Sequence, residues 1–383
     1  MESSLLKSRG FWIGIAVSAV FVGIFVYTSD VRHPAKLRHA FSDVNYAWIA
    51  ASLPVYYLAL WIRTVRWQYL LRPVKKVSAI RLYPVVIIGL MANNLIPARA
   101  GELARAYVLG QREKISKTTT LGTIAVDRLF DGVTLVPMLL IVGVFASGDA
   151  TFTVGWRWLT IDLNLAGLGI FMSALFGAAM AVLFYLTLST RGRTQLHTLI
   201  HRFAPQSVKP KVEGLIDSFL EGLQALRSPV DLAAALLMSI ASWTLEALMY
   251  YLVARGFGIH EGFHIFLLLT AAANLVIAVV ATQGGVGAFE LVVSKTIVAF
   301  GTASLAGSPQ FKALSEAYAI GLHAILLFPI VVIGLYLMWS MQFNFSDMLR
   351  SNRSDAPPAP ENDADAAEGR LRAAKPAVGR EHV

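Results

Sequence analysis

The stretch LYPVVIIGLMANNLIPARAGE, residues 82–102, decides the architecture that we expect for this chain. It opens as an apolar run long enough for a membrane helix, and Asn93-Asn94, Pro97 and Gly101 then interrupt it. Proline lacks the amide hydrogen and glycine has high backbone freedom, so both residues break helices. Irregular backbone at membrane depth is tolerated only where it is buried in protein or lines a cavity. The stretch therefore predicts a helical hairpin that enters the membrane and returns.

The rest of the chain has the composition of a membrane protein. Apolar residues make up 56% of the 383 residues and charged residues 15%, against about 45–50% and about 25% in soluble domains. Lysine and arginine outnumber aspartate and glutamate by 33 to 24. In a membrane protein this excess is typical of cytoplasmic loops and does not indicate nucleic-acid binding. Cysteine is absent, so disulfides and thiolate metal sites are excluded.

Eight hydrophobic segments predict an all-α polytopic membrane protein. Most have the roughly 17–25 residues that a helix needs to cross a bilayer. They are Phe11–Tyr27, Tyr46–Ile62, Leu82–Pro97, Thr118–Ala146, Leu165–Leu188, Leu232–Val253, Phe263–Thr282 and Ala317–Met341. The seventh segment is also broken, at Gln283-Gly284-Gly285-Val286-Gly287. We therefore expect six full spans and two re-entrant helical hairpins, with eight plain spans as the alternative.

The distribution of basic residues sets the expected orientation. The connections 63–81 and 99–117 carry six and five lysines and arginines, and the basic loops of a membrane protein are the cytoplasmic ones. Both connections lie on one side only if the segment between them re-enters. A second re-entrant hairpin at 263–300 leaves both of its sparsely charged flanks outside. Two interrupted segments in corresponding halves are typical of a transport site in an inverted repeat, so we expect an inverted repeat with both termini cytoplasmic.

Two polar regions complete the expected domain organisation. Residues 1–341 form the membrane domain, in which 189–229 is a cytoplasmic amphipathic connection. Apolar residues recur there at helical spacing from Val212 to Leu226. This pattern predicts a helix that lies on the bilayer or packs on the bundle, with a partner-docking site as the alternative. Residues 342–383 are rich in proline, alanine and acidic residues, a composition that predicts a disordered cytoplasmic tail.

Charged side chains inside apolar segments are costly and are candidates for function. Asn94, Arg99, Glu102 and Arg105 lie around the first break. Free amides at the start of a helix near Gly101, together with two guanidinium groups, suit an anionic group such as a phosphate. The alternative is that the arginines mark the membrane interface and that Glu102 pairs with them.

A second candidate set is Asp127, Arg128 and Asp131 in the next segment. The two aspartates share a helix face at i,i+4 spacing, and Arg128 neighbours Asp131 at i,i+3 spacing. The set is net negative and needs a further cation, which Arg99 or Arg105 can supply. The alternatives are a structural ion-pair network, or paired carboxylates that bind a metal or carry protons.

The third candidate set lies at the second break and consists of Gly284, Gly285, Gly287 and Glu290. Glycine lets the backbone approach a ligand or another helix closely. The run is not a P-loop, because no Gly-Lys-Ser/Thr follows it. Two further buried polar residues are expected in structural roles: Glu246 paired with a polar neighbour, and His323 hydrogen-bonded in the packing.

In combination, three motifs resemble the lysylphosphatidylglycerol synthase transmembrane-region family. The motifs are Asn94-x-x-Pro97-x-Arg99-x-Gly101-Glu102-x-x-Arg105, Val126-Asp127-Arg128-x-x-Asp131 and Gly284-Gly285-x-Gly287-x-x-Glu290. The resemblance covers residues 10–341. This family is the flippase-like membrane module of the multiple peptide resistance factor and also occurs as stand-alone bacterial membrane proteins. Its last motif usually begins Pro-Gly-Gly, and here Gln283 takes the place of the proline.

The resemblance implies a multi-pass protein of the bacterial inner membrane that transports or flips a lipid, such as an anionic phospholipid or a hopanoid. Arg99 and Arg105 would hold the headgroup phosphate, the acidic residues and Arg128 would organise the site, and the glycine motif would form the opposing wall. The alternatives are a membrane-embedded glycosyl- or head-group transferase that uses a lipid-linked substrate, and a non-transporting scaffold. The aminoacyl-transferase domain of the resistance factors is replaced here by the polar tail, so no lysyltransferase activity is expected.

Neither a cofactor nor a metal is expected. The expected partners are membrane lipids and not nucleic acid. A second copy of the chain or a lipid-modifying enzyme are the protein partners that this interpretation allows.

Overall fold

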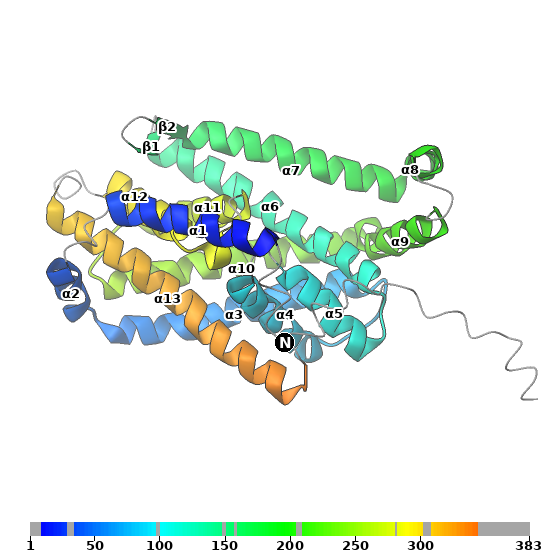
Figure 1. The fold of residues 1–383 in the computed structure, drawn as a ribbon, viewed down its shortest axis with the longest axis horizontal. Coiled ribbons are helices and arrows are strands. Elements are labelled where there is room, and N and C mark those ends of the chain that lie inside the picture. The colour runs from blue at the N-terminus through cyan, green and yellow to red at the C-terminus, as the bar shows by residue number, and fades with distance from the viewer. Residues whose placement is uncertain are drawn as a thin grey trace, which may run out of the picture. The chain divides into compact units, whose positions relative to one another are not determined.

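The computed structural model describes residues 9–28, 34–96, 100–147, 151–156, 159–203, 209–279, 282–301 and 308–343, and these are helical apart from one β-hairpin (Figure 1). Arg99 and the tail from residue 344 lie outside the described residues, so the expectations for them remain predictions. The helices of the first half are α1 (Arg9–Thr28), α2 (Pro34–Ser42), α3 (Tyr46–Leu71), α4 (Ala79–Leu95), α5 (Gly101–Glu113) and α6 (Lys117–Ser147). Strands β1 (Thr151–Trp156) and β2 (Leu159–Asn164) follow.

The second half contains α7 (Leu165–Leu188), α8 (Thr190–Phe203), α9 (Lys209–Gly222), the 3-10 helix η2 (Gln224–Arg227), α10 (Pro229–Gly256), α11 (Phe263–Val279), the 3-10 helix η3 (Gln283–Gly285), α12 (Ala288–Phe300) and α13 (Pro309–Ser340). Among the described residues, three helices are long and apolar enough to cross a membrane: α3, α10 and α13. Two of them start in the same way, with a serine N-cap followed by proline at the first helical position. This pair of residues is favoured at helix starts.

The prediction of an all-α protein missed one element, the antiparallel hairpin of β1 and β2. Its register runs from Thr151 opposite Asn164 to Trp156 opposite Leu159. Residues 147–164 lie between two of the predicted apolar segments, and no strand was expected there. Short alternating runs of β-branched and aromatic residues, TFTVGW and LTIDLN, explain the strands.

Helices α3 and α10 pack along each other in opposite directions (Figure 1). The amide of Asn45 at the start of α3 donates to the carbonyl of Gly256 at the end of α10, at 2.9 Å. At the other end of the pair, Arg72 lies 3.6 Å from Asp231. The two helices are therefore antiparallel over their whole length.

Helix lengths repeat along the chain. Helices α3 to α6 have 26, 17, 13 and 31 residues. Helices α10 to α13 have 28, 17, 13 and 32 residues. In each half, a long helix is followed by two short helices and a second long helix. Because α3 and α10 are antiparallel, their two halves begin in opposite directions.

Helices α4 and α5 form an antiparallel hairpin. Near its tip, Asn93 accepts a hydrogen bond from the amide of Gly101, at 2.8 Å. Gly101 permits this approach, because a Cβ there would collide with the backbone oxygen of Gly89. At the open end of the hairpin, Arg81 in the first turn of α4 pairs with Glu113, the last residue of α5, at 3.2 Å. The start of α4 and the end of α5 therefore lie at the same end of the hairpin.

The tips of the two helix hairpins meet. The side-chain amide of Gln283 donates to the carbonyl of Leu95 at 2.7 Å, and its backbone amide donates to Ser18 of α1, also at 2.7 Å. Gly284 has a φ of +61°, and a Cβ there would lie 3.1 Å from the carbonyl oxygen of Asn94. The break in the first half and the break in the second half are thus direct neighbours.

Two connections between helices are shorter than predicted from the ends of the apolar segments. The expected loop at 63–81 begins later, because α3 continues to Leu71. Arg63 and Arg66 are therefore buried helix residues, and two of the six charges in that loop do not report on membrane orientation. Glu316 directly precedes the predicted segment Ala317–Met341, but it is buried within α13.

The polar connection between α7 and α10 packs on the helix bundle through α9. Gly122 of α6 and Gly222 of α9 allow this contact, because a Cβ on Gly122 would lie 3.0 Å from the Cα of Gly222. The hydroxyl of Thr119 donates to Glu221 at 3.1 Å. Of the two helix placements that the sequence left open, the structure thus shows α9 packed on α6.

Candidate functional site

Arg66 lies at the centre of a buried ionic cluster that joins four helices, α3, α5, α6 and α10. It comes from α3, and its side chain is fully buried. Its Nε donates to Asp127 of α6 at 2.9 Å, and its Nη1 lies 2.8 Å from Asp131, one turn further on. Nη1 also donates to the hydroxyl of Ser239 on α10, at 2.8 Å. The sequence analysis missed Arg66, because it counted this residue among the basic residues of a loop.

Two further arginines complete the cluster. Arg105 of α5 donates to Asp127 Oδ2 at 3.1 Å. Arg128 lies 3.0 Å from Asp131 Oδ2 and 3.5 Å from Asp127 Oδ2. The structure thus brings together four residues that the sequence singled out. It also places three guanidinium groups around the fully buried carboxylate of Asp127.

Tryptophan side chains hold the cluster in place. The guanidinium group of Arg105 lies 4.1 Å from the ring centroid of Trp67, a cation–π contact. The indole of Trp67 donates to Thr123 at 3.1 Å, and the indole of Trp243 donates to Asp131 at 3.2 Å. Each indole N–H therefore has a polar partner in the interior, as buried tryptophans usually do.

A second buried ion pair joins α3 and α10. Arg63 of α3 donates to Glu246 of α10 at 2.8 Å, and its guanidinium group lies 4.3 Å from the ring centroid of Trp243. Asn274 of α11 donates to the other oxygen of Glu246 at 3.3 Å. Glu246 has the polar partners that the sequence analysis expected, although the cation among them comes from the supposed loop.

One edge of the ionic cluster has unused hydrogen-bonding atoms. Among the described residues, five buried atoms of the cluster lack a hydrogen-bond partner: Arg66 Nη2, Asp131 Oδ2, Glu102 Oε2, Arg105 Nε and Arg128 Nε. The first two lie within ion pairs, 2.7 Å from Asp127 Oδ1 and 3.0 Å from Arg128 Nη1, which leaves Glu102 Oε2 and the two Nε atoms. The Arg128 side chain is also 36% exposed, whereas that of Arg66 is 0% exposed. Buried polar atoms are nearly always paired, so unpaired ones call for an explanation such as an absent ion or ligand. The edge formed by Glu102, Arg105 and Arg128 is therefore the part of the cluster that can receive one; we call it the open edge.

The glycine motif forms a separate polar set at the second hairpin. Its three glycines all have positive φ, which favours glycine. Glu290 Oε2 accepts from the amide of Gly287 at 2.7 Å, and Oε1 lies 2.6 Å from Nδ1 of His323 on α13. The other ring nitrogen of His323 lies 2.9 Å from the carbonyl oxygen of Gly284. Within the described part of the chain, no ion pair links this set to the ionic cluster.

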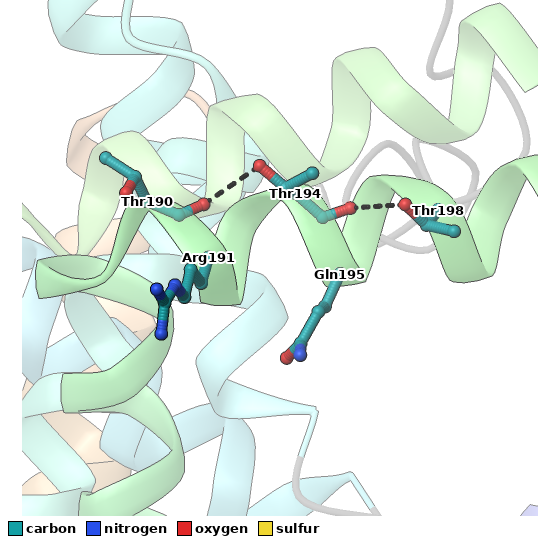
Figure 2. A pocket seen from close by; sticks show the side chains of 5 residues that line it. All are labelled: Thr190, Arg191, Thr194, Gln195 and Thr198. Carbon is teal, nitrogen blue, oxygen red and sulfur yellow. Dashed lines mark hydrogen bonds between the residues drawn. The ribbon is translucent and has the colours of Figure 1, made fainter.

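Two surface pockets lie away from both sets. One is a groove on α8, where the hydroxyls of Thr194 and Thr198 donate to carbonyls one turn earlier, at 3.0 and 2.8 Å (Figure 2). The other lies between α2 and the start of α13 and is lined mainly by apolar side chains, with His39 and Asp43 at its rim. Neither pocket is lined by a residue of the ionic cluster. The candidate chemistry therefore lies inside the helix bundle.

Comparison with known proteins identifies the family. Residues 11–334 match the sequence profile of the lysylphosphatidylglycerol synthase TM region, so the chain belongs to this family. This confirms the resemblance carried by the three motifs. Family membership and the apolar helices together make the chain a multi-pass membrane protein.

Several archaeal proteins are similar to this chain. A UPF0104 membrane protein of Methanothermobacter thermautotrophicus is 26% identical, over 72% of this chain and 80% of its own length. Another from Pyrococcus horikoshii is 24% identical, over 75% of this chain and 86% of its own length. Glycosyltransferase AglD of Haloferax volcanii is 26% identical over 76% of this chain, but the match spans only 48% of AglD. No solved structure matches the chain.

Proposed function

We propose that this membrane protein translocates a lipid with an anionic headgroup between the two leaflets. The proposal rests on the contact between two helix hairpins that come from corresponding halves of the chain. The same molecule contains a buried ionic cluster whose open edge has unpaired polar atoms. Broken helices of this kind form substrate sites in transporters with inverted repeats. The headgroup would cross between the hairpins while the acyl chains stay in the bilayer.

The helix lengths support hairpins that re-enter the membrane. Helices of 17 and 13 residues are about 25 and about 20 Å long, less than the roughly 30 Å of a hydrocarbon core. The pairing of Arg81 with Glu113 brings both ends of the first hairpin to one side. Because α3 and α10 are antiparallel, the second hairpin would open to the opposite side. These features favour six full spans and an inverted repeat.

The open edge is the proposed headgroup site. The unpaired Nε atoms of Arg105 and Arg128 are donors that a phosphate oxygen can accept from. Arg66 and the two aspartates would keep these guanidinium groups in position. We extend the site to Arg99, as the sequence motif predicts.

With six spans, both termini lie on one side of the membrane, and the basic connections put that side in the cytoplasm. The relatives named above are archaeal. Placement in a bacterial inner membrane therefore stays a prediction.

Replacement of Arg128 by lysine tests the proposal. Lysine keeps the charge but loses the planar fork that binds a phosphate through two donors. One charge-assisted hydrogen bond contributes about 1.5–3 kcal/mol, so Arg128→Lys should slow translocation of a fluorescent anionic phospholipid in proteoliposomes by about 10- to 100-fold. Arg112→Lys, a matched change on α5 away from the cluster, should leave the rate unchanged. Equal rates for both variants and the unmodified protein would refute the headgroup site.

A head-group or glycosyl transferase is the second candidate, because one similar protein is named a glycosyltransferase. The same proteoliposomes distinguish the two functions when polyprenyl-linked sugars are added. Mass spectrometry of the recovered lipids would detect covalent transfer. Movement of lipid without a change in mass supports translocation, and a new glycolipid supports the transferase.

A further inference from the structure

His323 bridges the tip of the second hairpin and the start of α12. Its Nδ1 contacts Glu290 in the first turn of α12, and its Nε2 contacts the carbonyl of Gly284 at the tip. Both side chains are nearly buried, with 6% and 11% of their surface exposed. The ring also lies against Phe289, with centroids 4.5 Å apart. The imidazole is therefore fixed with each nitrogen facing an oxygen.

The number of protons in this arrangement follows from its geometry. A carbonyl oxygen only accepts, so Nε2 must carry a hydrogen to bond Gly284. A neutral imidazole has one N–H, and its Nδ1 would then be an acceptor. An acceptor nitrogen 2.6 Å from a carboxylate oxygen needs a proton between them, on His323 or on Glu290. Without that additional proton, one of the two contacts of His323 must break.

We propose that the second hairpin contains a proton-binding site, formed by His323 and Glu290, whose occupancy holds the tip of this hairpin against the first one. The tip carbonyl bound by His323 directly follows Gln283, which donates to Leu95 of the first hairpin. Loss of the proton breaks one of these two contacts, so His323 no longer ties the tip to α12. The proton comes from water and returns to water. Its role as the ion coupled to lipid movement rests on the function proposed above.

Among the described residues, no ion pair joins His323 or Glu290 to a further charged side chain. The other ionisable side chains described on the packed helices have neighbours of their own. Glu246 is bound by Arg63, Lys295 lies near Lys312 and Glu316, and the hydroxyl of Tyr318 donates to the carbonyl of Tyr250. His264 lies at the far end of α11, and α1 and α4 contact the tip through Ser18, Val22 and Asn94, which carry no charge.

The distance between the hairpin tips provides the test. Spin labels on Leu95→Cys and Val286→Cys, both at partly exposed tip positions, report this distance in the full chain, which has no native cysteine. We expect one short distance at about pH 5, where the shared proton is bound, and an additional longer population at about pH 9, where it is lost. Glu290→Gln should keep the short distance at both pH values, because its amide NH₂ donates to Nδ1 without a titrating proton.

Two further variants make the result decisive. His323→Gln, which removes the titrating ring, should abolish the pH response, whereas Glu316→Gln, a buried carboxylate on the same helix as His323, should respond like the unmodified protein. A pH-independent distance in the unmodified protein, or a pH response retained in Glu290→Gln or His323→Gln, would overturn the proton site. The distance does not depend on lipid movement. Absence of translocation with an intact pH response would therefore refute the transport function and leave the proton site standing.

Discussion

Replacement of Arg66 by methionine should strongly destabilise the protein. The change removes the contacts of a fully buried guanidinium group with Asp127, Asp131 and Ser239, at 2.8–2.9 Å. The cluster then keeps three carboxylates, those of Asp127, Asp131 and Glu102, but only two arginines to balance their charge. Breaking a buried ion pair by removal of one partner costs about 3–5 kcal/mol, a factor of about 100 to 5,000 in the ratio of folded to unfolded protein. The measurement is the midpoint of denaturation by sodium dodecyl sulfate in mixed micelles.

The matched control is Arg72→Met at the C-terminal cap of the same helix. Arg72 is 42% exposed and lies 3.6 Å from Asp231, and exposed ion pairs contribute at most about 1 kcal/mol. Asp131→Asn introduced together with Arg66→Met should recover part of the loss, because it restores the charge balance. A midpoint shift for Arg66→Met no larger than that for Arg72→Met would refute the view that this cluster stabilises the helix bundle.

Two further predictions concern the first hairpin. Gly101→Ala should lower the free energy of unfolding by about 1–3 kcal/mol, because its Cβ would collide with the carbonyl of Gly89. Gly177→Ala is the control and should be tolerated, because no atom lies within 4 Å of the added carbon. Equal effects of the two changes would contradict the close helix contact. Cysteines placed at Lys75 and at Arg112 should both react with a membrane-impermeant thiol reagent added from the cytoplasmic side, and reaction from opposite sides would leave eight ordinary spans.

Local sequence was sufficient to predict the helices, because the length of an apolar segment and the breakers at its end act locally. The structure bears out a helical membrane protein, in which three of the described helices are long and apolar enough to cross a bilayer. The count of eight segments stays a prediction. The ends of α3 and α13 were harder to predict. A basic residue directly after an apolar run has the same local pattern whether it reaches the membrane interface or enters a buried ion pair. Arg66 is distinguished only by Asp127 and Ser239, which come from distant parts of the chain.

The candidate site could be predicted in part for the same reason. The i,i+4 spacing indicated that Asp127 and Asp131 share a helix face, and the i,i+3 spacing indicated that Arg128 neighbours Asp131, which the structure shows at 3.0 Å. The net negative charge of the three residues indicated a missing cation. Arg63 and Arg66 directly follow an apolar segment. Matching these two arginines with the need for a further cation could have identified the centre of the cluster from the sequence. The partner of Glu290 could not be found in this way, because His323 is 33 residues away on another helix.

The two halves of the molecule have similar helix lengths but different charge chemistry, and under the proposed function this difference favours movement of the second hairpin. The first hairpin is tied down by arginines, at Arg105 with Asp127 and at Arg81 with Glu113. Arginine stays charged at every physiological pH, so protonation cannot release these contacts. The second hairpin depends on a histidine, the side chain best suited to change charge near neutral pH. An inverted repeat built this way would keep α4 and α5 fixed as the headgroup platform, while α11 and α12 open and close against it.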